Sequence, residues 1–274
     1  MVCFPNIGGN RRIFAALLLG MVAMTGCADK DVLAHIPPFA RAPYQAFSRA
    51  ALVQIALREW RLFGETTGED DDDEAVKPER EQGLWQRVGE YWWLGLNRDA
   101  PEVTWTGKHD ARGKIFPPED DGNFAWSAAF ISYAMRIAGA GAAFPYAADH
   151  AHYINAAKRM APGTEHGWLI VAERPEVYAP LQGDLICHGR GRAAGVRFDD
   201  LPTAALFPAH CDIVVDTSKR GEIGVIGGNI RDSVTLRRIP ATADGKLARA
   251  DGTVLDQDRA WFAVLRVLEP AAGG

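Results

Sequence analysis

Three residues capable of nucleophilic chemistry stand in separate short segments of the chain. Ser127 follows a tryptophan at the start of an Ala-rich stretch, His210 opens an apolar stretch, and Asn229 follows two glycines. A serine hydroxyl attacks an acyl carbon when a histidine takes its proton, and an amide can orient that imidazole. The first turn of a helix also offers unpaired N–H groups that can hold an oxyanion. The three residues therefore form a candidate hydrolase site.

Each of these residues also has a non-catalytic interpretation. A serine directly before an Ala-rich helix is a common N-cap. A histidine at the start of a strand can be a hydrogen-bonded structural residue, and an asparagine after two glycines is typical of a turn. Residue type and spacing leave both interpretations open for Ser127, His210 and Asn229.

The order of these segments resembles that of the CHAP and NlpC/P60 cell-wall hydrolases, papain-like enzymes whose nucleophile helix begins Trp-Cys-Ala-x-Phe. The segment Gly183-Asp184-Leu185-Ile186 is similar to their Gly-Asp-hydrophobic strand. Over about residues 84 to 268 the chain resembles the DUF2272 family of that clan. The resemblance implies an α+β, papain-like fold with N-terminal helices packed on an antiparallel sheet. It also implies nucleophile, base and orienting roles for Ser127, His210 and Asn229.

The chain departs from that pattern at the nucleophile, where Ser127 stands in place of cysteine. A serine is far less acidic than a thiol, so it needs a base during attack. Many CHAP domains also carry a glutamate where this chain has Gly227. Trp126, His150 and Asp184 are candidates for lining the cleft. A working site requires Ser127 within reach of His210 and open to solvent, and a separation beyond about 6 Å or a buried Ser127 would exclude it.

Three functions are compatible with these residues. The first is hydrolysis of amide bonds in peptidoglycan peptides by a peptidase or amidase. The second is a catalytically inactive domain that binds peptidoglycan or a periplasmic partner protein. The third is a serine esterase acting on another periplasmic acyl group, which suits a serine nucleophile better than an amide does.

Metal and nucleic-acid chemistry have little support in the sequence. His150 and His152 are two residues apart, so on a helix they face different sides and chelate poorly. The chain contains no His-x-x-x-His and no paired Cys-x-x-Cys. The formal net charge of −5 does not suggest a nucleic-acid binder. We expect no metal and no cofactor.

The first 26 residues have the pattern of a secretory signal peptide. Arg11 and Arg12 precede an apolar run that is too short to span a bilayer, and small residues follow it. The ending Met-Thr-Gly-Cys resembles a bacterial lipobox, which implies lipidation of Cys27 and anchoring to a membrane by acyl chains. Ala28 after that cysteine favours the periplasmic face of the outer membrane, with the inner membrane as the alternative. The alternative is a secreted protein without a lipid anchor.

Two cysteines remain after this processing, because Cys3 leaves with the signal peptide and Cys27 carries lipid. Cys187 and Cys211 both lie in strand-like segments, and an exported protein meets an oxidising compartment. We predict a disulfide between them, with two small buried thiols as the alternative.

The remaining pattern predicts one domain over residues 44–270, after a tether over 27–43. Apolar spacing and composition predict four helices, at 44–63, 84–96, 126–138 and 150–160. Apolar β-type runs predict six strands, at 169–171, 184–187, 212–215, 223–226, 234–239 and 263–268. Between the first two helices lies an acidic loop, residues 65–82, which includes six consecutive acids at 69–74. Helices first and strands after is typical of an α+β fold with an antiparallel sheet.

Overall fold

The computed structural model describes residues 46–68, 77–161, 163 and 165–269. The chain divides at Tyr44 into two units, of which the second, Gln45–Gly274, holds all of the described residues. The expected signal peptide, the lipidation site Cys27 and the whole tether lie outside the described residues. The same is true of residues 69–76 in the acidic loop.

Within the described residues, four α-helices form where apolar residues recur with helical spacing. They are α3 (Arg49–Leu62), α4 (Leu84–Gly95), α5 (Ser127–Ile137) and α6 (His150–Met160). Two of them begin at side-chain caps: Ser48 accepts a hydrogen bond from the Ala51 N–H, and Asp149 accepts one from the His152 N–H. The predicted start of α6 at His150 is therefore confirmed, whereas α3 begins five residues after the predicted Tyr44. Short 3-10 helices occupy Pro78–Arg80, Pro118–Phe124, Gly141–Ala143, Gly191–Ala193 and Phe198–Asp200.

All six predicted strands are present and form one antiparallel sheet. They are β1 (Ile170–Glu173), β2 (Leu185–Gly189), β3 (Ala209–Asp216), β4 (Glu222–Ile230), β5 (Ser233–Pro240) and β6 (Trp261–Val267). Their order across the sheet is β1-β6-β2-β3-β4-β5. The predicted α+β class with an antiparallel sheet is confirmed, and β6 lies between β1 and β2.

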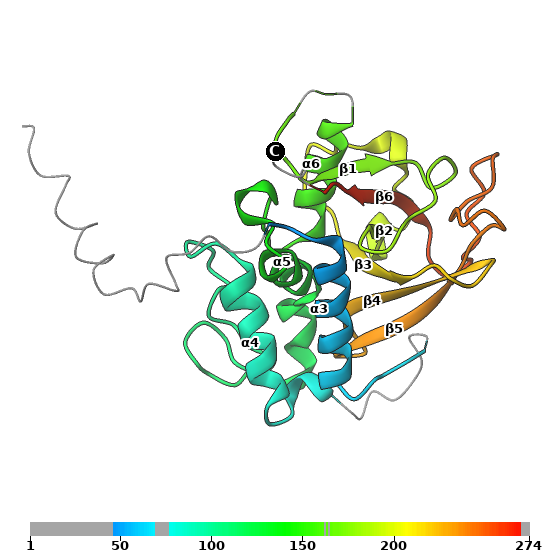
Figure 1. Cartoon of the computed structure of the whole chain (residues 1–274). Helices are drawn as coiled ribbons and strands as arrows, with labels where there is room; N and C mark the ends of the chain where they lie inside the picture. The colour runs from blue at the N-terminus through cyan, green and yellow to red at the C-terminus, as the bar shows by residue number, and fades with distance from the viewer. Residues whose placement is uncertain (1–45, 69–76, 162, 164, 270–274) are drawn as a thin grey trace, which may run out of the picture. The chain divides into compact units, whose positions relative to one another are not determined.

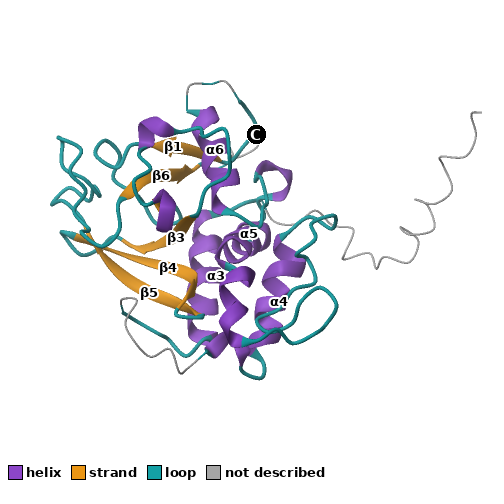
Figure 2. Ribbon diagram, turned by 180° about the vertical axis from the view of Figure 1, so that it is seen from behind, coloured by secondary structure: helices purple, strands orange, loops and turns teal. Residues whose placement is uncertain are grey.

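The helices pack on one face of this sheet, with α5 next to α3 and α4 (Figures 1 and 2). α5 is the most deeply buried helix, because Ala129, Phe130 and Ile131 have no exposed surface. A second, smaller core lies around Trp261 and Val264, with Leu247 packed against them. These two cores hold the sheet on both sides and fix the strand ends that carry the candidate site.

An ion pair joins the first described helix to the sheet. The Arg49 guanidinium lies 2.9 Å from the Asp184 carboxylate and donates a hydrogen bond to the Val267 carbonyl at 2.8 Å. Asp184 also accepts the Val267 N–H at 2.8 Å. The start of α3 is thereby fastened to both β2 and the end of β6.

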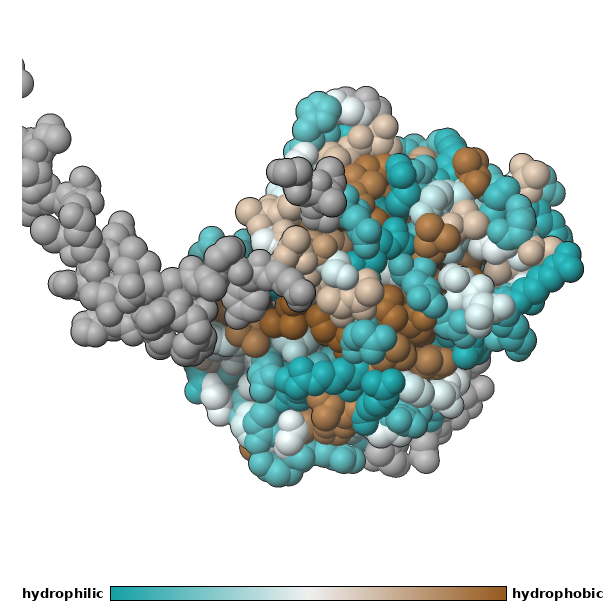
Figure 3. All heavy atoms as spheres, viewed as in Figure 1, coloured by the Kyte–Doolittle hydropathy of each residue, from teal (hydrophilic) through white to brown (hydrophobic). Residues whose placement is uncertain are grey.

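Apolar surface gathers at the centre of the face shown in Figure 3, over the helical layer, with hydrophilic surface around it. Exposed large apolar side chains on the helices include Leu62, Trp93, Leu94 and Ile137. In the described part of the chain, no helix combines the length and the apolar character that crossing a membrane requires.

Candidate active site

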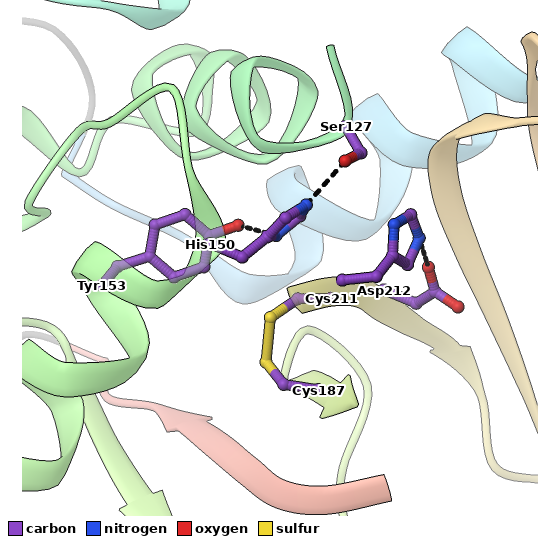
Figure 4. Close-up of a disulfide and its surroundings, with 7 residues drawn as sticks. Ser127, His150, Tyr153, Cys187, Cys211 and Asp212 are labelled. Atoms are coloured by element: carbon purple, nitrogen blue, oxygen red, sulfur yellow. Dashed lines mark hydrogen bonds and ion pairs between the residues drawn. A yellow bond between two sulfur atoms is a disulfide. The ribbon is translucent and has the colours of Figure 1, made fainter. Parts of the chain in front are cut away.

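Ser127 is the first residue of α5, and its hydroxyl is directed at a histidine. Ser127 Oγ and His150 Nε2 lie 2.7 Å apart and share a hydrogen bond (Figure 4). The N-cap position belongs to Trp126, whose side chain makes no capping bond. The interpretation of Ser127 as a cap is therefore not what the structure shows, because its hydroxyl is bonded to His150.

His150 is held between Ser127 and a tyrosine one turn along α6. Its Nδ1 shares a short hydrogen bond with the Tyr153 hydroxyl (Figure 4). Burial, and then the neighbouring His210, hold the pKa of His150 well below its usual value. The ring is therefore neutral at neutral pH, and when its proton is on Nδ1 the Nε2 lone pair faces the Ser127 hydroxyl.

His210 is the second residue of β3, and its partner is an aspartate on the same strand. His210 Nε2 lies 2.9 Å from Asp212 Oδ1, and Arg237 on β5 donates to Asp212 Oδ2 at 2.5 Å. Although burial opposes ionisation, the charges of Arg237 and His210 hold the pKa of Asp212 below its usual range. Asp212 is thus an ionised carboxylate that accepts a hydrogen bond from the His210 Nε2–H group. The other ring nitrogen of His210, Nδ1, is then the unprotonated one.

A third histidine completes a buried row. The His150 and His210 rings have centroids 5.2 Å apart, and those of His188 and His210 are 5.6 Å apart. Burial, and then His210, lower the pKa of His188 to about 3. His188 and His210 are cross-strand partners in the sheet, directly beside the pair Cys187 and Cys211.

The predicted disulfide is confirmed at that neighbouring pair. Cys187 and Cys211 are bridged, with Cα atoms 4.2 Å apart (Figure 4). The bond joins β2 to β3 one residue away from both histidines. It therefore restrains the strand ends on which His188 and His210 stand.

Two glycines allow β4 to approach the site. A Cβ at Gly227 would lie 2.0 Å from Asp212 Oδ1 and 2.9 Å from His210 Nε2. A Cβ at Gly228 would lie 2.7 Å from side-chain atoms of Trp126 and Phe130. Only the absence of a side chain lets this strand lie against both the His210–Asp212 pair and the start of α5.

The site is closed in this structure. Ser127 and His150 are each 4% exposed, and His210 is 3% exposed. The sequence-based hypothesis of an active hydrolase required an exposed serine, and the structure does not meet that condition. A substrate reaches Ser127 only if the surrounding side chains move.

The other predicted site residues have different surroundings from those expected. Asn229 lies half-buried in β4 at a φ of 57°, beside a register irregularity between Gly227 and Ile230, and His210 is paired with Asp212 instead. Trp126 is fully buried among aromatic rings, 5.5 Å from Tyr91, and so does not line a cleft. Of the three cleft-lining candidates, His150 is the one whose side chain shares a hydrogen bond with Ser127.

Asp184 is a structural residue rather than a cleft residue. Besides its bonds to Arg49 and the Val267 N–H, it accepts hydrogen bonds from the Tyr178 hydroxyl and the Leu181 N–H. Burial raises the pKa of Asp184 from its usual value. Its carboxylate is fully occupied at the start of β2, which explains why an acidic residue begins this strand.

A separate acidic cluster lies behind Trp126. Oxygen atoms of Glu79, Asp121 and Asp232 lie within 4.8 Å of one another, the spacing of a metal site. The Lys77 ammonium already lies 2.7 Å from Asp121 and 3.3 Å from Asp232. Glu79 accepts a short hydrogen bond from the Trp126 indole. Burial, and then Asp232, raise the pKa of Glu79 to about 8. The Lys77 ammonium therefore balances negative charge in this cluster.

Sequence reasoning missed three residues of this arrangement: Tyr153, Asp212 and Arg237. Tyr153 stands three residues after His150, which is the spacing of neighbours on one helix face. Asp212 stands two residues after His210, which is the spacing of neighbours on one side of a strand. The spacings of Tyr153 and Asp212 could therefore have been recognised in the sequence. No sequence pattern indicated Arg237, because only the pairing of β4 with β5 brings it near Asp212.

Comparison with known proteins gives one match. The family described as "Uncharacterized protein conserved in bacteria (DUF2272)" matches residues 79–267. This range contains α4, α5, α6 and all six strands. No curated protein and no solved structure matches the chain.

Proposed function

Since the chain belongs to the DUF2272 family over residues 79–267, we propose that this domain is a serine hydrolase built on the papain-like scaffold of the CHAP and NlpC/P60 enzymes. Its substrates are amide bonds of peptidoglycan peptides. The observation that carries the proposal is the 2.7 Å contact between Ser127 Oγ and His150 Nε2 at the start of a helix. The proposal assigns the base to His150 instead of His210, because His150 is the imidazole that Ser127 contacts.

The proposed chemistry follows from this chain of groups. As Ser127 Oγ attacks the acyl carbon, its proton passes to His150 Nε2, and Tyr153 accepts a hydrogen bond from His150 Nδ1–H. The free N–H groups of the first turn of α5 hold the oxyanion. His150 then returns the proton to the leaving amine, and water releases the acyl group by the reverse route.

The burial of Ser127 favours a second candidate. At 4% exposure for both Ser127 and His150, the pair resembles a structural hydrogen bond in a closed core. In this alternative the domain is catalytically inactive and binds wall peptide or a periplasmic partner. The expected lipid anchor brings peptidoglycan within reach in either case.

The test compares wild type with Ser127→Ala, Ser127→Cys, His150→Gln and His210→Gln on purified peptidoglycan and on p-nitrophenyl acetate. We expect kcat to fall at least about 100-fold in Ser127→Ala and His150→Gln, as for loss of a nucleophile or base. In His210→Gln, kcat should fall much less. Circular dichroism and thermal melting of each variant separate loss of chemistry from loss of folding.

Each other outcome selects a different function. A larger loss of kcat in His210→Gln than in His150→Gln would identify His210 as the general base. Activity that appears only in Ser127→Cys would indicate an intact scaffold whose present role is binding. Turnover of the ester without release of wall peptides would favour the esterase. Equal activity of wild type and Ser127→Ala would remove Ser127 as the nucleophile.

A further inference from the structure

Two hollows of the described structure share the lining residue Asn97. Their volumes are about 270 Å³ and 610 Å³. We call the two hollows together the groove and name it by six of their lining residues: Trp93, Leu94, Asn97, Arg136, Tyr146 and Trp168. Each volume is within or near the range of small-molecule sites.

The junction between the two hollows contains polar atoms that lack partners. The Arg136 guanidinium stacks over the Tyr146 ring at 3.7 Å and donates to Asn97 Oδ1 at 3.1 Å. Arg136 Nε and the Tyr146 hydroxyl are buried atoms without a hydrogen-bond partner among the described residues. A buried donor without a partner costs about 1–3 kcal/mol. Because both atoms are buried, a ligand oxygen reaches them only when the stacked Arg136 and Tyr146 side chains move apart.

Each hollow is lined by a tryptophan. Trp93 is 57% exposed, and Trp168 is half-buried with its indole N–H donating to Glu165 Oε2 at 3.0 Å. Flat indole faces pack well against the C–H faces of sugar rings, while neighbouring amide, imidazole and guanidinium groups pair with sugar hydroxyls. A residue as large as Trp93 exposed next to a hollow is typical of a binding surface.

The charged lining has more cations than anions. Arg98 and Arg136 line the smaller hollow, and Arg159 lines the larger one together with a single acid, Glu165, with which it pairs. Guanidinium groups recognise carboxylates by paired hydrogen bonds. The ligand that fits the groove therefore combines sugar rings, hydroxyl oxygens and carboxylates.

We propose that this groove binds a carboxylate-bearing glycan chain. The inference rests on the proposed function, for which it names the polymer that the domain holds. His152 lines the groove, and His150, two residues earlier on α6, contacts Ser127. The first turn of α6 therefore separates the glycan groove from the hydrolase site. Peptide-free muramic acid units, which keep their carboxylates, lie in the groove on one side, and the peptide of a neighbouring unit on the same strand lies near the other side.

The test measures binding by the folded chain with Ser127→Ala, so that bound polymer is not cleaved. The probes are peptide-free glycan strands from peptidoglycan, whose muramic acid units keep a carboxylate, together with polygalacturonate and neutral chitin oligosaccharides. Calorimetry should give binding to the carboxylated chains and at least tenfold weaker binding to chitin. Trp93→Ala and His152→Ala, both at exposed positions, should each raise the Kd at least tenfold. Leu206→Ala is the matched control, because Leu206 is also 57% exposed and lies outside the groove.

The outcomes separate this inference from the proposed function. Binding to none of the three polymers, or equal Kd values for the groove variants and Leu206→Ala, would overturn the glycan groove. Chitin bound as tightly as the carboxylated strands would overturn it too, because the arginines would then contribute nothing. Equal binding of polygalacturonate would support the carboxylated class while assigning it a source other than the wall. Hydrolysis by wild type without glycan binding defeats only this inference, and binding without hydrolysis defeats only the proposed function.

Discussion

At the scale of residues, this domain buries an unusual number of titratable groups around one serine. His150, His188, His210 and Asp212 all lie within the buried core, and Glu79 lies behind Trp126. Burial penalises the charged form of each group, so the histidines favour the neutral state and Glu79 favours the protonated state. Asp212 keeps its charge because Arg237 neutralises it. Hydrogen bonding among these groups, not their individual types, sets which imidazole faces Ser127.

The stability of the fold should depend on pH through Glu79. Its folded pKa of about 8 lies above the usual 4.5, so the folded chain keeps a proton that the unfolded chain releases. The contribution of Glu79 to the unfolding free energy is therefore present below pH 4.5 and is lost as the pH rises toward 8. We expect wild type to lose stability relative to Glu79→Gln over this range, by at most about 1.4 kcal/mol per pH unit.

Urea unfolding of both proteins at several pH values measures this difference. The groups that face Glu79 are Asp121, Asp232 and Lys77, together with the Trp126 indole, and all remain in the variant. Glu119→Gln, at an exposed position, is the control and should run parallel to wild type. A difference between wild type and Glu79→Gln that does not change with pH would show that Glu79 is ionised throughout.

The residue types of the site were predictable, whereas their pairing was not. Ser127 and His210 stood out because they open a helix and a strand. The sequence could not reveal that His150 reaches Ser127, since that depends on how the loop before α6 places its first turn. The closure of the site was equally invisible, because it arises from side chains that surround Ser127 in space and are distant from it in the chain.

At the scale of elements, periodicity and composition were sufficient for almost every helix and strand. α6 was placed to the residue, because Asp149 is a cap and the apolar spacing begins directly after it. The ends of α3 and of several strands shifted by a few residues, since pairing with neighbours extends or shortens an element beyond its apolar run. β3, for example, begins at Ala209 because β2 offers it partners from Leu185 to Gly189.

The close contact between β4 and α5 gives a prediction for Gly228. In Gly228→Ala the added Cβ would collide with Trp126 and Phe130, and we expect a loss of about 1–3 kcal/mol in unfolding free energy. Urea unfolding measures the loss. Gly195→Ala is the control, because nothing lies within 4 Å of its added Cβ and Gly195 is exposed. Equal stability of the two variants would show that β4 does not depend on this contact.

At the scale of the whole molecule, one covalent bond supports the strands beneath the site. Reduction of the Cys187–Cys211 bond, or its removal in Cys187→Ala/Cys211→Ala, should lower the unfolding free energy by about 3 kcal/mol for a loop of this length. Urea unfolding with and without dithiothreitol measures the change. The double variant should not respond to the reductant. A wild type equally stable in both conditions would show that the bond contributes nothing to stability.

The position of the molecule in the cell is tested at Cys27. We expect Cys27→Ser to abolish incorporation of labelled fatty acid and to release the protein from the membrane fraction. The measurement is metabolic labelling followed by fractionation, with Cys3→Ser as the control that keeps its label. A labelled Cys27→Ser chain, or an unlabelled wild type, would contradict lipidation at this residue.

The position of β6 in the sheet has a consequence for the folding chain. β6 follows the other five described strands in the sequence, yet it separates β1 from β2 and supplies the carbonyl that holds Arg49. Until β6 has paired, β1 has no neighbour in the sheet and one side of β2 is unpaired. Unpaired strand edges invite aggregation and proteolysis. A chain truncated before Trp261 would therefore expose an open sheet edge.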